Sequence, residues 1–182
     1  MEPVVSSSED LSLPTPPEQL FEILDGLEIV YEIHHHAPIF TVEEGAHLKV
    51  DIPGVHCRNL FLRDKKKAMY LVVAANETMI DLKKLSDLIG SGRLSFGSAE
   101  RLWDYLGIRP GSVCPFCVIN DEAHEVRVVL DAAMMEAEIV NYHPLDNAMT
   151  IGLSPADLLR FFAHTGHAPH IVNLTAAAPD PT

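Results

Sequence analysis

Hydrophobic and polar residues follow two periods along the chain, and one stretch shows the strand period clearly. Two apolar runs, at residues 60–62 and 69–73, flank a charged turn at residues 64–67. Short apolar runs separated by a polar turn are typical of a β-hairpin. The pattern therefore predicts a hairpin in the middle of the fold, with a cation and an amide, Arg58 and Asn59, at the start of its first strand.

The helical period, together with capping residues, predicts the helices. Thr15 and Thr41 each precede a glutamate by three residues, which is the arrangement of a capping box. Ser98 and Ser154 stand before two later apolar stripes, and glycines follow those stripes. The predicted helices cover residues 16–26, 41–50, 78–89, 98–105, 132–137 and 155–165.

Apolar runs of strand length predict the rest of the fold. Two of them, residues 113–119 and 126–130, are expected to form a hairpin around Asn120 and Asp121. Strands outnumber helices and several are joined by hairpins, so the pattern predicts an α+β fold with a mixed, largely antiparallel sheet flanked by helices. The predicted strands cover residues 29–33, 60–62, 69–73, 113–119, 126–130, 139–142, 149–153 and 170–174.

The length of 182 residues is typical of one domain with a sizeable core. Residues 1–14 are rich in Ser, Glu and Pro and are expected to form a disordered extension. Residues 15–175 are expected to be the folded domain and residues 176–182 a flexible tail. No apolar run approaches the roughly 18 residues that span a bilayer, and the N-terminus lacks the features of a signal peptide. We therefore expect a cytoplasmic protein with no membrane partner.

The net charge of −13 argues against broad binding of nucleic acid, because such binding depends on neutralising phosphates. DNA is therefore not an expected partner. Two local groups of cations remain candidates for contacting one RNA end, although each is also compatible with an ordinary solvated surface. The first group comprises Arg58, Arg63, Lys65, Lys66 and Lys67, and the second comprises Lys83, Lys84 and Arg93.

The cysteines and histidines do not form a recognisable metal or redox motif. Cys114 and Cys117 have C-x-x-C spacing, but no second pair of ligands accompanies them, and Cys57 would be an unusual complement. Three successive histidines at residues 34–36 cannot all bind one ion, since neighbours on a strand point to opposite faces. We expect buried structural cysteines, no metal and no cofactor, with His36 on the face of any site.

Polar residues at strand ends and turns are the remaining candidates for chemistry. The chain contains no G-x-S-x-G or H-E-x-x-H motif. Arg58 and Asn59 precede one strand, residues 111–115 precede another, and His143 follows a third. An arginine and an amide can together bind a phosphate, an ester carbonyl or a ribose hydroxyl. The alternatives are a solvated cation, an amide at a strand edge and a satisfied turn histidine.

Residues 57–66, Cys-Arg-Asn-Leu-Phe-Leu-Arg-Asp-Lys-Lys, resemble the K-N-L-F-L-[KR]-D motif of the freestanding prolyl-tRNA editing proteins. These proteins are relatives of the YbaK domain and of the editing insertion in bacterial prolyl-tRNA synthetase. The resemblance extends over residues 17–174. Its further segments are residues 36–44, 81–85, 90–96, 106–121 and 141–145.

The resemblance implies a deacylase that acts in trans on mischarged proline tRNA, most directly on its alanyl ester or on that of another small amino acid, without metal or cofactor. Arg58, Asn59 and His143 would be catalytic, with Asn59 orienting the terminal ribose and the attacking water. The amino-acid pocket would comprise His36, Gly111, Ser112, Val113, Pro115 and Cys117. The acceptor end of the tRNA would contact Arg63, Lys65, Lys66, Lys83 and Arg93, and prolyl-tRNA synthetase is a further candidate partner.

Two departures from the family pattern bear on activity. Arg58 stands where the family usually has lysine; it keeps the positive charge but cannot act as a general base. Cys117 stands where the family commonly has the glycine of a P-F-G pattern. A side chain at this position would reshape the pocket, so the amino acid removed need not be alanine. Two alternatives stay open: a non-catalytic module of the same fold that binds an RNA end or a synthetase, and a deacylase for the cysteinyl ester of proline tRNA.

Overall fold

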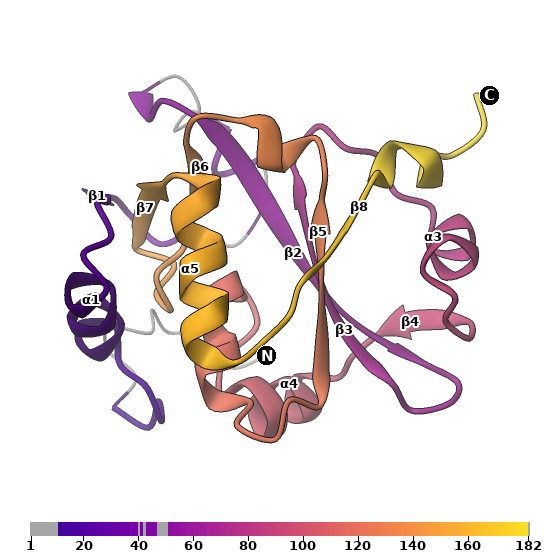
Figure 1. The fold of residues 1–182 in the computed structure, drawn as a ribbon, viewed down its shortest axis with the longest axis horizontal. Coiled ribbons are helices and arrows are strands. Elements are labelled where there is room, and N and C mark those ends of the chain that lie inside the picture. The colour runs from indigo at the N-terminus through magenta and orange to yellow at the C-terminus, as the bar shows by residue number, and fades with distance from the viewer. Residues whose placement is uncertain (1–10, 40, 42, 47–50, 182) are drawn as a thin grey trace.

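A mixed sheet organises the computed structural model, which describes residues 11–39, 41, 43–46 and 51–181. Within these residues, eight strands lie in the order β1-β7-β6-β2-β3-β5-β8, and β4 lies beside β2 (Figure 1). Four of the strand pairings are antiparallel and three are parallel. The predicted α+β class with a mixed sheet is confirmed. The strands are β1 (Glu32–His35), β2 (Val55–Asp64), β3 (Met69–Ala75), β4 (Leu94–Phe96), β5 (Val126–Asp131), β6 (Val140–Tyr142), β7 (Met149–Leu153) and β8 (His170–Val172).

Apolar side chains cover both faces of the centre of the sheet. On β3, Leu71 and Val73 pack into a core with α1, α4 and α5, whereas Tyr70 and Val72 pack into a smaller core with α3 and η4. Burial on both faces explains why β3 is a continuous apolar run. The α-helices are α1 (Pro17–Gly26), α3 (Leu82–Ile89), α4 (Ala99–Leu106) and α5 (Pro155–Thr165), and the 3-10 turns are η2 (Pro115–Asn120), η3 (Met134–Glu136) and η4 (Leu174–Ala177).

Local capping signals locate most helix ends correctly. The Ser98 and Ser154 hydroxyls accept hydrogen bonds of 3.1 Å from backbone N–H groups in the first turns of α4 and α5. Gly107 and Gly166 end these helices in the left-handed conformation, which glycine adopts without strain. The central hairpin is also confirmed, with Arg63 of β2 paired to Met69 of β3.

The predicted strand at residues 113–119 is wrong, and so is the hairpin that it was expected to form. Pro115 begins the 3-10 turn η2 instead, because proline lacks the N–H that a strand ladder needs and has the φ angle of a first helical residue. Phe116 and Val118 of this turn are buried, and a short buried turn has the same apolar composition as a buried strand. Instead of forming the predicted hairpin, β5 pairs in parallel with β3 and β8.

Several other predicted ends are also wrong. The strand predicted at residues 60–62 is β2, which begins at Val55, so Arg58 and Asn59 lie within the strand rather than before it. The third helix begins at Leu82 rather than at residue 78, because the Asp81 carboxylate caps it. Thr15 does not cap α1; its hydroxyl donates to the Asn120 side chain at 2.7 Å. The first strand begins at Glu32 rather than at residue 29.

Two further short helices are predicted, at residues 41–50 and 132–137. The predicted helix at 132–137 is only the 3-10 turn η3. Thr41 and Glu44 exchange the hydrogen bonds of a capping box, at 3.1 and 3.3 Å, and residues 43–46 form a turn. Residues 47–50 of the first prediction lie outside the described residues.

The C-terminal segment returns to the sheet and to α3. Ala177 is buried, and the Lys84 ammonium donates to the Ala178 carbonyl at 2.9 Å and to Asp180 at 2.6 Å. The domain limits at residues 14 and 175 stay predictions. No helix in the described part of the chain is long and apolar enough to cross a membrane.

Candidate functional site

A cavity of about 250 Å³ opens where β2 changes its neighbours. Along one edge, β2 pairs with β6 only at Val55 and His56 and with β4 only from Leu62 to Asp64. No described strand pairs with residues 57–60 on that edge, which leaves them free to line a cavity. We call it the central cavity, and its lining residues are Ile39, Thr41, Gly45, His56, Cys57, Arg58, Asn59, Asn76, Gly111, Val113, Asn141, Tyr142, His143 and Thr150.

Three asparagines give the central cavity a set of unused hydrogen-bond acceptors. The side-chain oxygens of Asn59, Asn76 and Asn141 are buried, and none accepts a hydrogen bond from the described residues. The Asn141 amide orientation is set by its Nδ2, which donates to the Pro53 carbonyl at 3.0 Å. A buried acceptor without a donor costs about 1–3 kcal/mol. Each of these oxygens therefore lacks the hydrogen bond that would offset its burial.

Arg58 supplies the positive charge of the central cavity. Its Nη2 donates to the Thr78 carbonyl, whereas its Nε–H is buried and finds no acceptor in the described residues. None of the described residues that line the cavity is Asp or Glu. A guanidinium stays protonated in proteins, so Arg58 can donate to a carbonyl or phosphate oxygen but cannot accept a proton.

His143 lines the central cavity as a neutral imidazole. Its Nδ1 lies 2.9 Å from the Met149 carbonyl, which can only accept, so Nδ1 carries the proton and Nε2 keeps its lone pair. Burial lowers the pKa of His143, and the nearby rings of His36 and His56 lower it further, whereas the Met149 hydrogen bond acts in the opposite direction. At neutral pH, His143 can therefore accept a hydrogen bond or a proton.

His36 lies next to His143 and is not among the residues that line the cavity. The two ring centroids are 6.2 Å apart. Both nitrogens of His36 have partners within the protein, the Thr150 hydroxyl at 2.8 Å and the Ala37 carbonyl at 2.8 Å. This arrangement leaves no ring nitrogen of His36 for a ligand.

The predicted pocket loop at residues 111–115 divides between cavity wall and core. Gly111, with a positive φ of 93°, and Val113 line the central cavity. Ser112 and Pro115 are buried and are not among its lining residues. Cys117 is fully buried in the main core, where its thiol donates to the Cys114 carbonyl at 2.8 Å. The Cys117 side chain therefore lies outside the cavity.

Sequence reasoning missed several lining residues. Asn76 directly follows β3, and a polar residue at a strand end was the signal that could have identified it. Asn141 lies two residues before His143 in the same motif. Burial raises the pKa of the Cys57 thiol to about 12, so Cys57 stays protonated and is not a nucleophile at neutral pH.

The cations predicted to contact tRNA lie apart from the central cavity. Lys65 and Lys66 occupy the exposed turn of the β2–β3 hairpin, and Arg93 immediately precedes β4, which pairs with Arg63. Lys65 lies six residues beyond Asn59, or about 20 Å along the strand direction. Lys83 is exposed on α3 and belongs to a different element.

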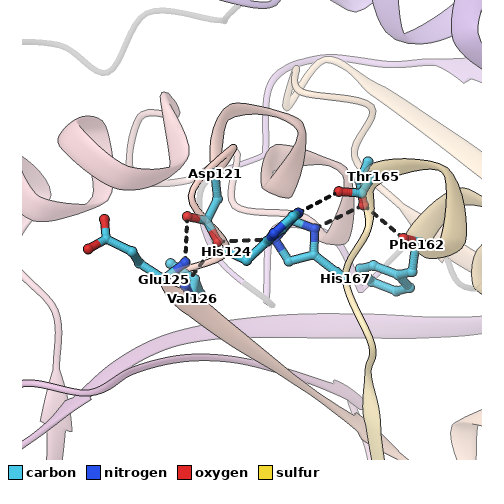
Figure 2. A network of polar contacts seen from close by, with 7 residues as sticks. All are labelled: Asp121, His124, Glu125, Val126, Phe162, Thr165 and His167. Atoms are coloured by element: carbon cyan, nitrogen blue, oxygen red, sulfur yellow. Dashed lines mark hydrogen bonds and ion pairs between the residues drawn. The ribbon is translucent and has the colours of Figure 1, made fainter.

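A second polar cluster, at the end of α5, has the composition of a nucleophilic triad (Figure 2). His167 lies 3.0 Å from both the Thr165 hydroxyl and the Asp121 carboxylate. The Thr165 hydroxyl also donates to the Phe162 carbonyl, and Asp121 also accepts from the N–H groups of Glu125 and Val126. These internal bonds fasten α5 to the start of β5. Across the described residues, no group of three or more His, Cys, Asp or Glu side chains is placed to hold a metal ion.

Comparison with known proteins locates the chain among editing proteins. Residues 36–161 match the family of the aminoacyl-tRNA editing domain. The prolyl-tRNA editing protein ProX of Acetoanaerobium sticklandii is 46% identical over 147 residues, which are 79% of this chain and 88% of ProX. The prolyl-tRNA synthetase associated domain-containing protein 1 of Bos taurus is 39% identical over 155 residues, which are 82% and 90% of the two chains.

Solved structures share the fold at low sequence identity. The crystal structure of a candidate trans-editing enzyme for prolyl-tRNA synthetase superposes with a TM-score of 0.64 at 18% identity and covers 87% of this chain and 97% of the other. The crystal structure of a hypothetical protein gives a TM-score of 0.66 at 18% identity, with 84% and 97% covered. At this level of identity the likeness concerns the fold alone.

Proposed function

Because the chain belongs to the aminoacyl-tRNA editing domain family and is thus an aminoacyl-tRNA deacylase, we propose that it hydrolyses the ester between a small non-cognate amino acid and proline tRNA. It would act in trans, as a protein separate from the synthetase. The proposal of proline tRNA rests on the identity to ProX over most of both chains.

The observation that carries the proposal is the match between the unused acceptors and an α-ammonium group. The side-chain oxygens of Asn59, Asn76 and Asn141 lack donors among the described residues. A primary ammonium has three N–H donors and a positive charge, which suits such acceptors, and Asn76 and Asn141 lie on either side of His56 in the sheet. No Asp or Glu lines the described wall to compete for the ammonium. A free amino acid ester is therefore a better ligand than a phosphate alone.

The volume of the central cavity supports a small acyl group. A cavity of about 250 Å³ has room for an alanyl-sized group, its ester and part of the ribose. A synthetase pocket that accepts proline cannot strongly reject a smaller amino acid, because a missing methylene is worth only about 1–3 kcal/mol. A second, smaller site can correct this error by hydrolysing the esters of amino acids small enough to enter it.

We assign the chemistry to water activated in the cavity. His143 presents an unprotonated Nε2, which would accept a hydrogen bond or a proton from the attacking water. The buried Nε–H of Arg58 would donate to the oxygen that gains negative charge as the ester carbonyl is attacked. The C–O bond to the ribose then breaks, and the ribose oxygen takes up the proton. Asn59 would orient the ribose and the water.

The separation between cavity and cations suits the proposed substrate. A single-stranded 3′ end that enters the central cavity would let the acceptor stem reach Arg63, Lys65, Lys66 and Arg93; along the strand direction, Arg63 is about 13 Å and Lys65 about 20 Å from Asn59. Lys83 lies on α3 rather than on the β2–β3 hairpin, so we propose a separate contact between Lys83 and the tRNA. A contact with prolyl-tRNA synthetase and a cytoplasmic location remain predictions.

Deacylation of purified tRNA(Pro) charged separately with alanine, serine, cysteine, 2-aminobutyrate and proline tests the proposal. We expect rapid loss of one or more small non-cognate amino acids, spared proline, and at least a tenfold lower rate for Asn59→Ala and His143→Ala. Asn173→Ala is the matched control, because Asn173 is an exposed asparagine that is not among the cavity-lining residues. Hydrolysis of only the cysteinyl ester would change the substrate. Hydrolysis of none, with measurable tRNA binding, would refute the proposal and favour a non-catalytic binding module.

A further inference from the structure

Arg58 shares one face of the sheet with a buried carboxylate two strands away. Arg58 of β2 pairs with Ala74 of β3, and Val73 pairs with Leu130 of β5, so Asp131 lies beside Ala74 one residue further along. Strand residues alternate between faces, which places Arg58, Ala74 and Asp131 in one row on one face. Ala74 contributes only a methyl group, so the two outer side chains can approach across it. Their strands are about 10 Å apart.

Thr78 fills the space between Arg58 and Asp131 and contacts both. The Thr78 hydroxyl donates to Asp131 Oδ2 at 2.6 Å, and the Thr78 carbonyl accepts from Arg58 Nη2. Asp131 is 0% exposed and Thr78 is 8% exposed, so water does not substitute readily for either bond. The other oxygen of Asp131 accepts from the Ala133 N–H at 3.3 Å. Burying a carboxylate away from water costs free energy unless hydrogen bonds or an opposite charge compensate it.

The link to Thr78 divides the donors of Arg58. Nη2 is held by the Thr78 carbonyl, whereas Nε–H remains without a partner in the described residues and belongs to a residue of the cavity wall. An arginine presents five donors in a planar fork, so one edge can be fixed while another faces a ligand. Because the fork is rigid, the position of Thr78 determines the direction of Nε–H.

We propose that Asp131 is a positioning residue for deacylation, which acts through Thr78 to hold the Arg58 guanidinium with its Nε–H directed at the reacting ester. The proposal rests on the proposed function, because it assigns a task to Arg58 in that reaction. Asp131 is not among the residues that line the central cavity, and it transfers no proton. Its carboxylate fixes the Thr78 hydroxyl, the hydroxyl fixes the Thr78 backbone, and the carbonyl of that residue fixes Arg58.

A double-mutant cycle on kcat and KM separates positioning from a general loss of structure. Thr78→Val removes the hydroxyl at nearly constant shape, Asp131→Asn removes the charge and one acceptor, and Thr78→Ser keeps the hydroxyl. We expect Thr78→Val and Asp131→Asn to lower kcat for the small-aminoacyl tRNA(Pro) by about tenfold or more, with KM changed by less than about threefold, and Thr78→Ser to stay within about twofold of wild type.

The same changes are repeated in an Arg58→Met background, which keeps the apolar stem and removes every donor. A positioning role predicts that Thr78→Val and Asp131→Asn then change kcat by less than about twofold, because the group that they position is gone. Equal fold-losses in both backgrounds would overturn the proposal, since they would indicate a structural role independent of Arg58.

A measurement that does not depend on activity tests the same contact. In a ¹H–¹⁵N spectrum of the arginine Nε–H groups, Thr78→Val and Asp131→Asn should shift or broaden the Arg58 signal, and the half-buried Arg63 on the same strand should stay unchanged. An unchanged Arg58 signal in a variant that remains folded would overturn the proposal, even if wild-type protein hydrolysed no ester. An altered Arg58 signal with inactive wild-type protein would support the contact and refute only the proposed function.

Discussion

The three unpartnered amide oxygens predict that the enzyme distinguishes substrates by the number of N–H donors as well as by size. Asn59, Asn76 and Asn141 offer three buried acceptors in one cavity. A primary ammonium has three N–H donors, whereas the secondary ammonium of proline has two, so we expect proline to leave one more acceptor unpaired. Proline would therefore be rejected even where its ring could be accommodated.

Two isomeric amino acids isolate this effect from size. 2-Aminobutyrate and N-methylalanine each add one carbon to alanine, but N-methylalanine has a secondary ammonium. One unsatisfied buried acceptor costs about 1–3 kcal/mol. With a factor of ten for each 1.36 kcal/mol, we expect kcat/KM for the N-methylalanyl ester to be roughly 5- to 150-fold lower than for the 2-aminobutyryl ester of the same tRNA(Pro).

Asn76→Leu provides the matched variant for this prediction. It removes one acceptor at similar volume and leaves the Asn141 bond to Pro53 intact. The primary ammonium then has one donor too many, so the preference for 2-aminobutyrate over N-methylalanine should shrink by about tenfold, whereas Asn173→Leu should leave it unchanged. Equal rates for the two esters in wild-type protein, or an unchanged preference in Asn76→Leu, would refute the reasoning.

Three further predictions concern other parts of the molecule. Burial lowers the pKa of His143, so the ring stays neutral at neutral pH. We therefore expect kcat/KM to stay level there and to fall only at pH values below about 6.5. A profile that already falls between pH 8 and pH 7 would contradict this role. Lys65→Ala with Lys66→Ala should raise KM several-fold, leave kcat unchanged and weaken the salt dependence of tRNA binding, whereas an unchanged KM would remove the hairpin turn from the tRNA-binding surface. Asp121→Ala should lower the free energy of unfolding by roughly 3–5 kcal/mol in a denaturant titration, because His167 and two backbone N–H groups lose their acceptor. The kcat of this variant should match that of wild type. A large loss of kcat in the folded variant would instead indicate chemistry at that cluster.

Local signals in the sequence were sufficient for the elements that depend on neighbouring residues. The hairpin of β2 and β3 follows from two apolar runs and a charged turn, and α4 and α5 follow from Ser98 and Ser154 with glycines at their ends. These features involve residues within a few positions of one another, so the chain itself carries the information. The prediction of an enzyme of the editing family came from a resemblance between motifs and was confirmed by the family comparison.

The same local information was misleading where burial, rather than backbone preference, selects the residue type. Residues 115–120 are apolar because Phe116 and Val118 fill the core, and the pattern could not distinguish a buried 3-10 turn from a buried strand. In the structure β5 pairs instead with its parallel neighbours, β3 and β8. Such pairings join distant segments and leave no signature in a short window.

The candidate site divides in the same way. Arg58, Asn59 and His143 lie in recognisable motifs, so the sequence by itself identifies them as candidates, although Arg58 and Asn59 lie within β2 rather than before it. Only the tertiary structure brings Asn76 and Asn141 to the same cavity as Asn59 and moves Cys117 into the core. The physical reason is that β2 pairs with β6 at one end and β4 at the other, which opens the sheet edge between them. Chain sections far apart in sequence meet at that opening, and what they share is position after folding rather than any local pattern.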